Sequence, residues 1–289
     1  LCYFIEYLTS RGLHITCISF LRLSRFGIEK PSKECYGIPV NVSTNNTLLE
    51  LILNTFLSLF MTIVITILHP KVVILSVPGA YPTIATYLSC ILTKSKLVID
   101  IRDPHEEIIV HKFRKGFSGL LAKVFKTINY SIYRKAHAVI AVTPTLATMI
   151  ANAIHRTVHI IPNGADLKVF TPVDKEIARK TFGLNSNSFL VVYIGALTRR
   201  GYYNVLPVAN AIKKIRKKYD IDIKLVVAGP IYGESKTAIE RFKEEIYYMG
   251  VLDTKNIVVL LSSCDVGLVP RVKDPIYNYA VPAKFFEYI

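Results

Sequence analysis

The chain alternates short runs of β-branched and other apolar residues with segments of helix length, and this alternation limits what it can fold into. Strands are predicted, in order along the chain, at residues 14–20, 72–77, 96–101, 138–142, 158–161, 189–194, 223–228 and 266–269. Because these runs are apolar almost throughout, they are typical of parallel sheets covered by helices on both faces. Ligands of such α/β folds bind beyond the carboxyl ends of the strands, so we expect the chemistry there.

The length of the chain indicates two domains. At about 150 residues per domain, the 289 residues suffice for two α/β domains with separate cores. The turn signal Asn163-Gly164 and the helix breaker Pro172 place the boundary near residues 163–175, where a second series of helices and strands begins.

The composition excludes several classes of protein. Hydrophobic residues make up 51% of the chain, which excludes a disordered protein, and 36 Lys and Arg against 21 Asp and Glu give a formal net charge of +15. This excess indicates an anionic partner such as nucleic acid, anionic lipid or a phosphorylated small molecule. Because the sequence has no zinc-finger, RNA-recognition or basic-zipper signature, no nucleic acid is expected among the partners.

The spacing of the cysteines and the absence of Gln indicate the redox compartment and the temperature range of the protein. The five cysteines occur singly and form no C-x-x-C pair, so their spacing predicts neither a zinc site nor a disulfide scaffold, and it favours a reducing compartment such as the cytoplasm. The chain contains no Gln, a thermolabile amide, while Lys and Ile are frequent, as in thermophile proteins.

Residues 51–68 form an uncharged apolar run without Gly or Pro, long enough to be a membrane-spanning candidate. The alternative is a helix that packs on the sheet and leads through His69 and Pro70 into the strand at residues 72–77. Polar residues interrupt the run, among them Asn54, Ser58 and Thr62. We therefore favour a packed or membrane-apposed helix over a spanning one.

Residues 112–135 carry seven basic side chains and no acidic one. Apolar residues recur in this segment at steps of three and four, which makes a stripe along one helix face: Phe113, Phe117, Leu120, Val124, Ile128 and Ile132. One interpretation is a basic amphipathic surface that docks on anionic lipid. The other, which we favour, is an ordinary helix whose stripe packs on the sheet while its lysines face solvent.

The most specific segment follows the predicted strand at residues 158–161 and reads IPNGADLKVFTP over residues 161–172. In it, Gly164 can supply a positive φ angle, Asp166 can accept hydrogen bonds from backbone donors of the turn, and Phe170 can anchor the linker to a core. Position for position, P-N-G-x-D-x-x-x-F-x-P resembles the interdomain signature of family 4-type, or group 1, retaining glycosyltransferases with the GT-B fold.

Four later segments follow the order of that family. Residues 193–201, YIGALTRRG, resemble the first strand and phosphate loop of its donor domain, and residues 225–230, LVVAGP, resemble its third-strand loop. Residues 264–270, CDVGLVP, resemble a later strand, and residues 282–288, PAKFFEY, the start of its donor-site helix. The resemblance covers essentially the whole chain but lacks the family's first strand and everything after this helix begins, so we expect a fragment cut at both ends.

The resemblance implies an α/β protein with the GT-B fold, in which two Rossmann-like, doubly wound parallel-sheet domains face a crevice. An acceptor-binding domain is expected at residues 1–168 and a truncated nucleotide-sugar-binding domain at residues 169–289. The family moves a hexose-type sugar, with retention, from a nucleotide-sugar donor to a glycan or lipid-linked acceptor, as in polysaccharide biosynthesis. No metal and no cofactor are expected. From composition alone, we expect a peripheral association with an anionic membrane surface, on the inner face of the cell membrane.

The resemblance also assigns cations to the donor site. When a nucleoside diphosphate leaves, negative charge builds on it, and fixed cations lower the barrier. Arg199 and Arg200 lie in the loop after Gly195, where they suit this role. The family usually has an Arg directly after the first Gly and a Lys before the second; here Ala196 and Arg200 stand at those positions, so the usual pair of cations is altered.

The donor-site helix supplies two further candidates. Glu287 matches the second of two glutamates that hold the ribose hydroxyls of the donor, and a carboxylate can accept from both hydroxyls of a diol. Tyr279 stands where the first glutamate is expected. Lys284 is expected to contact the phosphate or the sugar. For each candidate, the alternative is a solvent-exposed side chain without a role in the site.

A further candidate follows the predicted strand at residues 96–101. Asp103 matches an R-D form found in some branches of the family and would hold the acceptor hydroxyl or the sugar as a catalytic residue, together with Arg200 and Glu287. The alternative is that Asp103 caps the next helix, with Pro104 at its first position. The D-x-D of Asp220 and Asp222 precedes a strand, and we interpret it as a solvated strand start, not a metal site.

Two other functions remain open from the sequence. Nucleotide-sugar epimerases share the fold and would turn over without an acceptor. A membrane-associated, non-catalytic binding module would bind nucleotide or membrane and transfer nothing. The chain lacks the motifs of Rossmann dehydrogenases, P-loop NTPases, zinc proteases and serine hydrolases, which disfavours those classes.

Overall fold

The computed structural model describes residues 2–24, 27–29, 35–42, 54, 56, 58–77, 80–113, 115–197, 205–232, 235–271 and 273–289. The chain divides into two compact units. Unit 1 consists of residues 1–162 and 278–280, and unit 2 of residues 163–277 and 281–289. Two predicted site residues, Arg199 and Arg200, lie outside the described residues.

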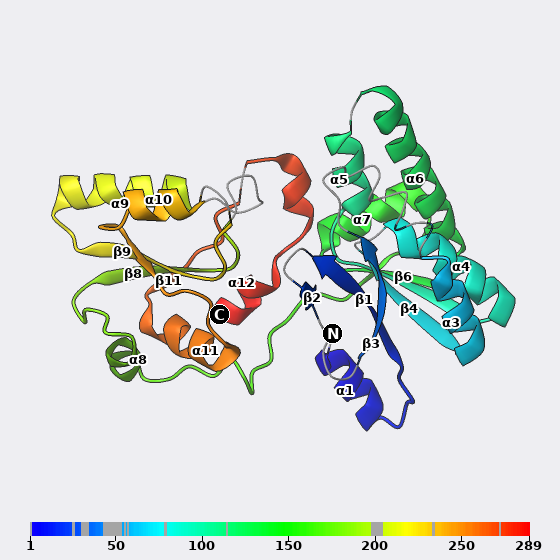
Figure 1. The fold of residues 1–289 in the computed structure, drawn as a ribbon, viewed down its shortest axis with the longest axis horizontal. Helices are drawn as coiled ribbons and strands as arrows, with labels where there is room; N and C mark the ends of the chain where they lie inside the picture. The colour runs from blue at the N-terminus through cyan, green and yellow to red at the C-terminus, as the bar shows by residue number, and fades with distance from the viewer. Residues whose placement is uncertain are drawn as a thin grey trace. The chain divides into compact units, whose positions relative to one another are not determined.

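Unit 1 contains a parallel four-stranded sheet in the order β4-β5-β6-β7. Its strands are β4 (Val72–Val77), β5 (Lys96–Ile101), β6 (Ala138–Ala141) and β7 (His159–Ile160), and the helices between them are α4 (Ala80–Thr93), α5 (His105–Lys112), α6 (Gly116–Lys135) and α7 (Pro144–Ile154). Figure 1 shows this succession of strands and helices. All four predicted strands are present, and β5 and β6, in the middle of the sheet, are the most buried of them.

The amino-terminal part of unit 1 forms a second sheet in the order β2-β1-β3. It follows α1 (Cys2–Ser10) and consists of β1 (Cys17–Ser24), β2 (Gly27–Glu29) and β3 (Cys35–Val42); α3 (Phe60–Leu68) then leads to β4. β1 pairs parallel to β3 and antiparallel to β2. Cys17 is disulfide-bonded, which the single spacing of the cysteines did not predict.

Unit 2 contains a second parallel sheet in the order β10-β9-β8-β11. Its strands are β8 (Phe189–Ile194), β9 (Ile223–Ala228), β10 (Ile246–Tyr248) and β11 (Val266–Gly267). Its helices are α8 (Lys175–Thr181), α9 (Leu206–Tyr219), α10 (Ser235–Arg241), α11 (Thr254–Ser263) and α12 (Ala283–Tyr288). A 3-10 turn at Pro275–Tyr279 begins in unit 2 and ends in unit 1. In Figure 1, α9 and α10 cover one face of this sheet, while α8 and α11 cover the other.

Alternate residues of the two central strands of unit 2 enter different cores. Val191 and Tyr193 of β8 pack with Ala209 and Ile212 of α9. The intervening residues of these strands pack on the opposite face with Leu184 and Leu260. Burial on both faces explains why the strands read as continuous apolar runs.

A topological switch occurs between β8 and β11. From β8 the chain proceeds outward to β9 and β10, then returns through α11 to place β11 on the other side of β8. In doubly wound sheets, ligands bind at the carboxyl ends of the strands beside such a switch. The end of β8 is therefore the first place to look for a site.

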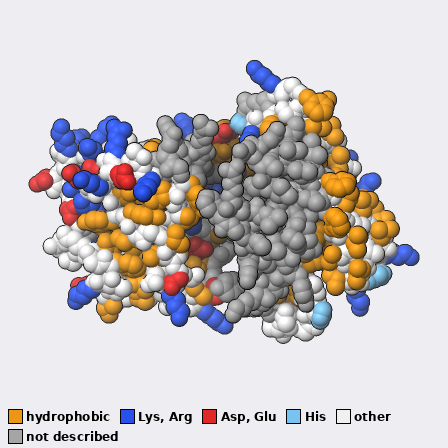
Figure 2. Space-filling model, viewed as in Figure 1, with side chains coloured by type: hydrophobic (Ala, Val, Ile, Leu, Met, Phe, Trp, Pro, Cys, Tyr) orange, Lys and Arg blue, Asp and Glu red, His pale blue; other side chains and the backbone are white. Residues whose placement is uncertain are grey.

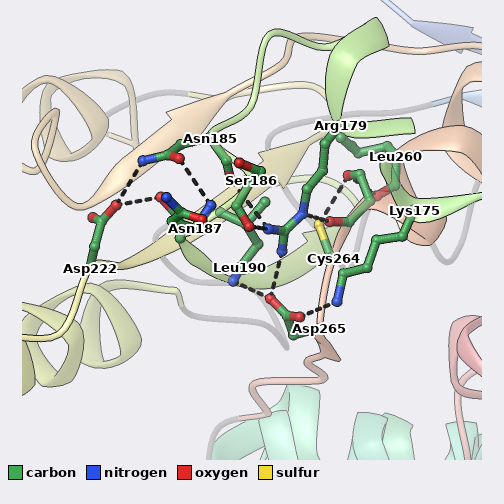
Figure 3. A network of polar contacts seen from close by, with 12 residues as sticks. Lys175, Arg179, Asn185, Ser186, Asn187, Leu190, Asp222, Leu260, Cys264 and Asp265 are labelled. Atoms are coloured by element: carbon green, nitrogen blue, oxygen red, sulfur yellow. Dashed lines mark hydrogen bonds and ion pairs between the residues drawn. The ribbon is translucent and has the colours of Figure 1, made fainter. Parts of the chain in front are cut away.

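A buried ion-pair network fastens α8 to the opposite, amino-terminal end of the sheet of unit 2. Arg179 is almost fully buried; its Nε donates to the Ser263 carbonyl at 2.9 Å, and its Nη2 lies 3.0 Å from Oδ2 of Asp265. The same oxygen accepts the backbone N–H of Leu190 in β8 at 2.6 Å, and Lys175 pairs with the other carboxylate oxygen. Figure 3 shows these groups converging on Asp265. The network is structural because it lies at the end of the strands opposite to the switch-point site.

The apolar run at residues 51–68 is helical in part. α3 begins at Phe60, and residues 51–53, 55 and 57 lie outside the described residues. In the described part of the chain, no helix has both the length and the apolar character needed to cross a membrane.

The apolar stripe of α6 faces solvent, so the favoured interpretation of residues 112–135 is wrong. Four of the six stripe residues are exposed: Phe117, Leu120, Val124 and Ile128. The buried face consists mainly of small and hydrogen-bonding residues, namely Gly119, Ala122, Asn129, Tyr130 and Tyr133. These residues allow close approach and bind the carboxylates of α5, and this packing turns the stripe outward.

Candidate functional site

The candidate site of unit 2 lies where β11 ends beside β8. β11 pairs with β8 only through Val191 and Val192, so the backbone of Ile194 extends beyond the ladder. Two side chains of α12 replace the missing strand: the Ile194 N–H donates to the Tyr288 hydroxyl at 3.0 Å, and the Ile194 carbonyl accepts from Lys284 Nζ at 2.8 Å. The side chains of Lys284 and Tyr288 therefore hold α12 against the end of β8, beside the topological switch.

The ammonium group of Lys284 is held in a partly buried position at this edge. It lies 4.5 Å from the centre of the Tyr193 ring, within range of a cation–π contact. The pKa of Lys284 is lowered to about 8, chiefly by burial and to a smaller extent by the charge of Arg271, while the charge of Glu287 opposes the shift. A cation with a lowered pKa beside a switch point is typical of a functional site.

Two glycines shape the strand ends next to Lys284. Gly195, a predicted donor-site residue, has a φ of +145°, and a Cβ there would lie 2.7 Å from Lys284 Nζ. Gly229, after β9, has a φ of +137°, and a Cβ there would lie 2.3 Å from the Gly195 carbonyl oxygen. Neither position tolerates a side chain, so the two loops pack backbone to backbone.

Glu287 follows Lys284 by three residues and lies on the same side of α12. It is half-buried, and burial raises the pKa of its carboxyl group while the charge of Lys284 lowers it. The structure thus brings together Gly195, Lys284 and Glu287, three of the predicted donor-site residues.

Arg271 is a cation at this site that the sequence analysis missed. It follows β11 by four residues, is largely buried, and donates from Nη1 to the Tyr277 carbonyl. It lies close enough to Lys284 for its charge to lower the pKa of that lysine. The only sequence signal for it was an arginine that follows a strand directly after Pro270.

The predicted interdomain segment forms a turn at the start of unit 2. Asn163 Nδ2 donates to the Val281 carbonyl at 3.1 Å, which ties the turn to the residues before α12. As expected, Asp166 accepts a backbone N–H, that of Lys168, at 2.9 Å. Gly164 does not adopt a positive φ, so its predicted conformational role is wrong. Within the described residues, no atom lies within 4 Å of where its Cβ would be.

In unit 1, Asp103 lies half-buried between the end of β5 and α5. The N-cap residue of α5 is Pro104, which has no side-chain acceptor, so Asp103 does not occupy the predicted cap position. His105 follows, and burial lowers its pKa while Glu106 and Asp103 oppose that shift. The nearby Arg102 pairs with Asp100 at 2.8 Å.

A buried polar cluster under this loop was also missed by the sequence analysis. Glu106 Oε1 accepts from Asn129 Nδ2 at 3.0 Å and from the Tyr133 hydroxyl. Burial, followed by the charge of Glu106, raises the pKa of Tyr133 well above its ordinary value. The cluster anchors the first turn of α5, and therefore the loop that carries Asp103, to α6.

Tyr279 belongs to unit 1, although it precedes the donor-site helix in sequence. Its carbonyl accepts from the Thr143 hydroxyl, and its ring packs against the core of the unit. The position where the family places its first glutamate is thus occupied by a packed aromatic residue.

Among the residues that the structure describes, no group of three or more His, Cys, Asp or Glu side chains is arranged to hold a metal ion. Asp222 lies at the amino end of β9, where it accepts hydrogen bonds from Ser188 and Asn185, and Asp220 ends α9 in a left-handed conformation. The D-x-D therefore starts a strand, as the sequence analysis expected.

Residues 1–169, more than half of the chain, match the family model described as Glycosyltransferase Family 4. The chain belongs to glycosyltransferase family 4. Two curated proteins are similar to it, and both are D-inositol 3-phosphate glycosyltransferases. That of Paenarthrobacter aurescens is 26% identical over 134 residues, which cover 44% of this chain and 32% of the relative. That of Pseudarthrobacter chlorophenolicus is 32% identical over 79 residues, which cover 27% and 19%. The chain thus matches a third or less of the length of these relatives.

Solved structures place this family 4 chain in the GT-B fold, as predicted. Sucrose-phosphate synthase from Thermosynechococcus elongatus superposes with a TM-score of 0.67 at 14% identity, covering 92% of this chain and 67% of the other. WaaG, a glycosyltransferase involved in lipopolysaccharide biosynthesis, has a TM-score of 0.59 at 14% identity, covering 92% and 69%. Anabaena HepE in complex with UDP-glucose has a TM-score of 0.54 at 16% identity, covering 88% and 73%. At these identities, the similarity concerns the fold.

Proposed function

We propose that the protein transfers a hexose-type sugar, with retention, from a nucleotide-sugar donor to a glycan or lipid-linked acceptor. The observation that carries this proposal is the group formed by Gly195, Lys284 and Glu287 at the switch point of unit 2. Gly195 leaves the backbone at the end of β8 open to a diphosphate, and the cation of Lys284 can bind that diphosphate. The carboxylate of Glu287 can accept hydrogen bonds from the hydroxyls of a ribose. HepE, which shares the fold, binds UDP-glucose.

The proposed chemistry follows from charge. As the bond between the sugar and the donor phosphate breaks, negative charge builds on the leaving diphosphate, and preorganised cations stabilise it. We assign this role to Lys284, with Arg199 and Arg200 from the loop after Gly195. Glu287 accepts the ribose hydroxyls, and Asp103 of unit 1 holds the acceptor hydroxyl or the sugar. In this proposal protein side chains neutralise the leaving group, and no metal or cofactor takes part.

Donor binding tests the proposal in a thermal-shift panel of UDP-, GDP-, ADP- and dTDP-glucose. A ligand at about 100 times its dissociation constant stabilises the folded protein by about 2.7 kcal/mol, which is readily detected. We expect a shift with one base, lost in Glu287→Ala and Arg200→Ala but kept in Glu240→Ala, a control at an exposed glutamate of α10. The absence of a shift with every donor, in folded protein, would contradict the proposal.

Product analysis then separates transfer from the alternatives. A glycosyltransferase releases the nucleoside diphosphate only when an acceptor is present, and NMR of the product gives the anomeric configuration. Conversion of the donor sugar without an acceptor would identify an epimerase. Donor binding without any turnover would identify a non-catalytic binding module.

Donor affinity is expected to depend on pH through Lys284. Because the pKa of Lys284 is lowered to about 8, its cation is complete below that pH and is lost above it. Affinity for the nucleotide sugar should therefore be constant near pH 7 and fall by up to about tenfold per pH unit as the pH approaches about 9. Lys284→Arg keeps its charge throughout this range and should bind independently of pH. Isothermal titration at several pH values measures both; a flat wild-type profile would contradict the role of Lys284.

A further inference from the structure

We infer that unit 1 docks on an anionic lipid bilayer through the outer faces of α3, α4 and α6. This lipid-facing surface, as we call it, consists of exposed apolar residues on three helices: Phe60, Ile63 and Ile67 on α3, Leu88, Ile91 and Leu92 on α4, and Phe117, Leu120, Val124 and Ile128 on α6. The inference adds a partner to the proposed transferase and rests on the proposed function only where the acceptor is lipid-linked.

The three helices form a continuous surface. α3 packs against α4, where the Thr62 hydroxyl donates to the Ala85 carbonyl at 3.3 Å, and α4 packs in turn against α6. Figure 2 shows hydrophobic side chains gathered along the right-hand edge of the molecule, in the region that Figure 1 labels α3, α4 and α6. A contiguous apolar surface of this kind marks an interaction site, whereas scattered single residues do not.

α4 exposes three large apolar residues while its most deeply buried positions are small or polar. Its buried positions are mostly small or polar: Thr83, Ala85, Thr86, Ser89, Cys90 and Thr93. The hydroxyls of Ser89 and Thr93 are satisfied within the helix, by the carbonyls of Ala85 and Ser89, at 2.8 Å each. Ile84 and Tyr87 of α4 pack against the core of the unit, whereas Leu88, Ile91 and Leu92 face outward.

The neighbouring helices also expose large apolar residues, although α3 buries Met61 and Ile65 against Ala85 of α4. On α6, Asn129 and Tyr133 point inward to Glu106, while Phe117 is 70% exposed. Before α3, Asn54 and Ser58 are buried, while Ile67 is 77% exposed. An apolar solvent outside the helices would favour this arrangement, as at the interface of a bilayer.

The charge around the surface selects anionic lipid over a protein partner. Residues 51–99 and 108–165, which include all three helices, contain no Asp or Glu. Exposed lysines flank the apolar residues: Lys71, Lys94, Lys96, Lys115, Lys123 and Lys135. Figure 2 shows Lys and Arg side chains at the margin of the hydrophobic region. An apolar centre with a basic rim complements the acyl chains and anionic headgroups of one leaflet.

Vesicle flotation of the full chain, without donor or acceptor, tests this inference. We expect binding to phosphatidylcholine vesicles that contain about one third phosphatidylglycerol, and much weaker binding to pure phosphatidylcholine. The variant Ile67→Gln/Leu92→Gln/Phe117→Gln should lose about tenfold or more in affinity for the anionic vesicles. The matched control Ile177→Gln/Ile221→Gln/Val251→Gln changes three exposed apolar residues of unit 2 and should bind as the wild type does.

A charge variant provides a second, independent test. Lys94→Glu/Lys123→Glu leaves the apolar residues in place and should also weaken binding to anionic vesicles, because two cations of the rim are reversed. Sedimentation velocity identifies the alternative occupant, a second copy of the chain.

Three results would overturn the inference. They are wild-type protein that fails to float with anionic vesicles, an apolar triple variant that floats as well as the wild type, and a wild-type dimer that the triple variant converts to monomer. Because donor binding is measured separately, failure of vesicle binding and failure of the proposed transfer reaction are distinguishable.

Discussion

Replacement of Asp265 by Ala is expected to destabilise the protein by about 3–5 kcal/mol, the cost of breaking a buried ion pair by removing one partner. The carboxylate pairs with Arg179, whose side chain is only 7% exposed, and it accepts the backbone N–H of Leu190. Its removal leaves a buried guanidinium without its counter-charge and an N–H without its acceptor. Urea denaturation followed by circular dichroism measures the loss as a lower midpoint.

Two further variants show how much of this loss of stability comes from the charge of Asp265, from its hydrogen bond with Leu190 and from its pair with Lys175. Asp265→Asn keeps an acceptor for the Leu190 N–H but removes the charge, and should cost less than Asp265→Ala. Lys175→Met removes the outer partner, whose side chain is 47% exposed, and should cost at most about 1 kcal/mol. An Asp265→Ala variant as stable as Lys175→Met would show that the buried pair contributes little.

The network also predicts sensitivity to acid. Burial raises the pKa of Asp265, but the hydrogen bond from Leu190 and the cations of Lys175 and Arg179 outweigh it, so the net shift is downward. The stability that Asp265 contributes is therefore present above its ordinary pKa and lost as the pH falls through the lowered value. In Asp265→Ala, the acid limb of the stability profile should be correspondingly shallower.

Lys284→Ala is expected to weaken nucleotide-sugar binding by about 1.5–3 kcal/mol, roughly 10- to 150-fold, the range for a hydrogen bond to a charged group. The loss combines the missing cation with the freed Ile194 carbonyl, which accepts from Lys284 Nζ at 2.8 Å. Isothermal titration with the donor identified in the thermal-shift panel measures the affinity.

Lys284 can act by binding the donor or by holding α12 against β8, and a variant of Tyr288 distinguishes these two roles. Tyr288→Phe removes the acceptor of the Ile194 N–H but no charge, so it should affect stability more than donor affinity. Lys284→Arg restores the charge and should recover part of the affinity. If Lys284→Ala binds the donor as the wild type does, Lys284 only fastens α12 to β8.

The sequence determined the architecture. The strands at residues 72–77, 96–101, 189–194 and 223–228 were predicted because a continuous β-branched run bounded by turn residues has few other ways to be buried. The order of the motifs also identified the family, and it placed Lys284 and Glu287 near the phosphate-binding strand end of Gly195.

The contacts that form the site came from the tertiary structure. Glu106 lies 23 residues from Asn129 and 27 from Tyr133, and only the packing of α5 on α6 brings them together. The effect of Arg271 on Lys284 likewise depends on how the chain folds back beside α12. The buried pair of Arg179 and Asp265 is separated by 86 residues, and only the return of β11 to β8 brings its members together.

The orientation of α6 shows most clearly what the sequence predicted and what only the packing decided. The spacing of Phe117, Leu120, Val124 and Ile128 established that these residues share one face, because a helix repeats about every 3.6 residues. Periodicity does not state which way that face points. The opposite face, with Asn129 and Tyr133, donates two hydrogen bonds to Oε1 of the buried Glu106 carboxylate, and these bonds favour burial of that face. The sequence by itself thus determined which residues act together, while packing decided whether they face the core or the surroundings.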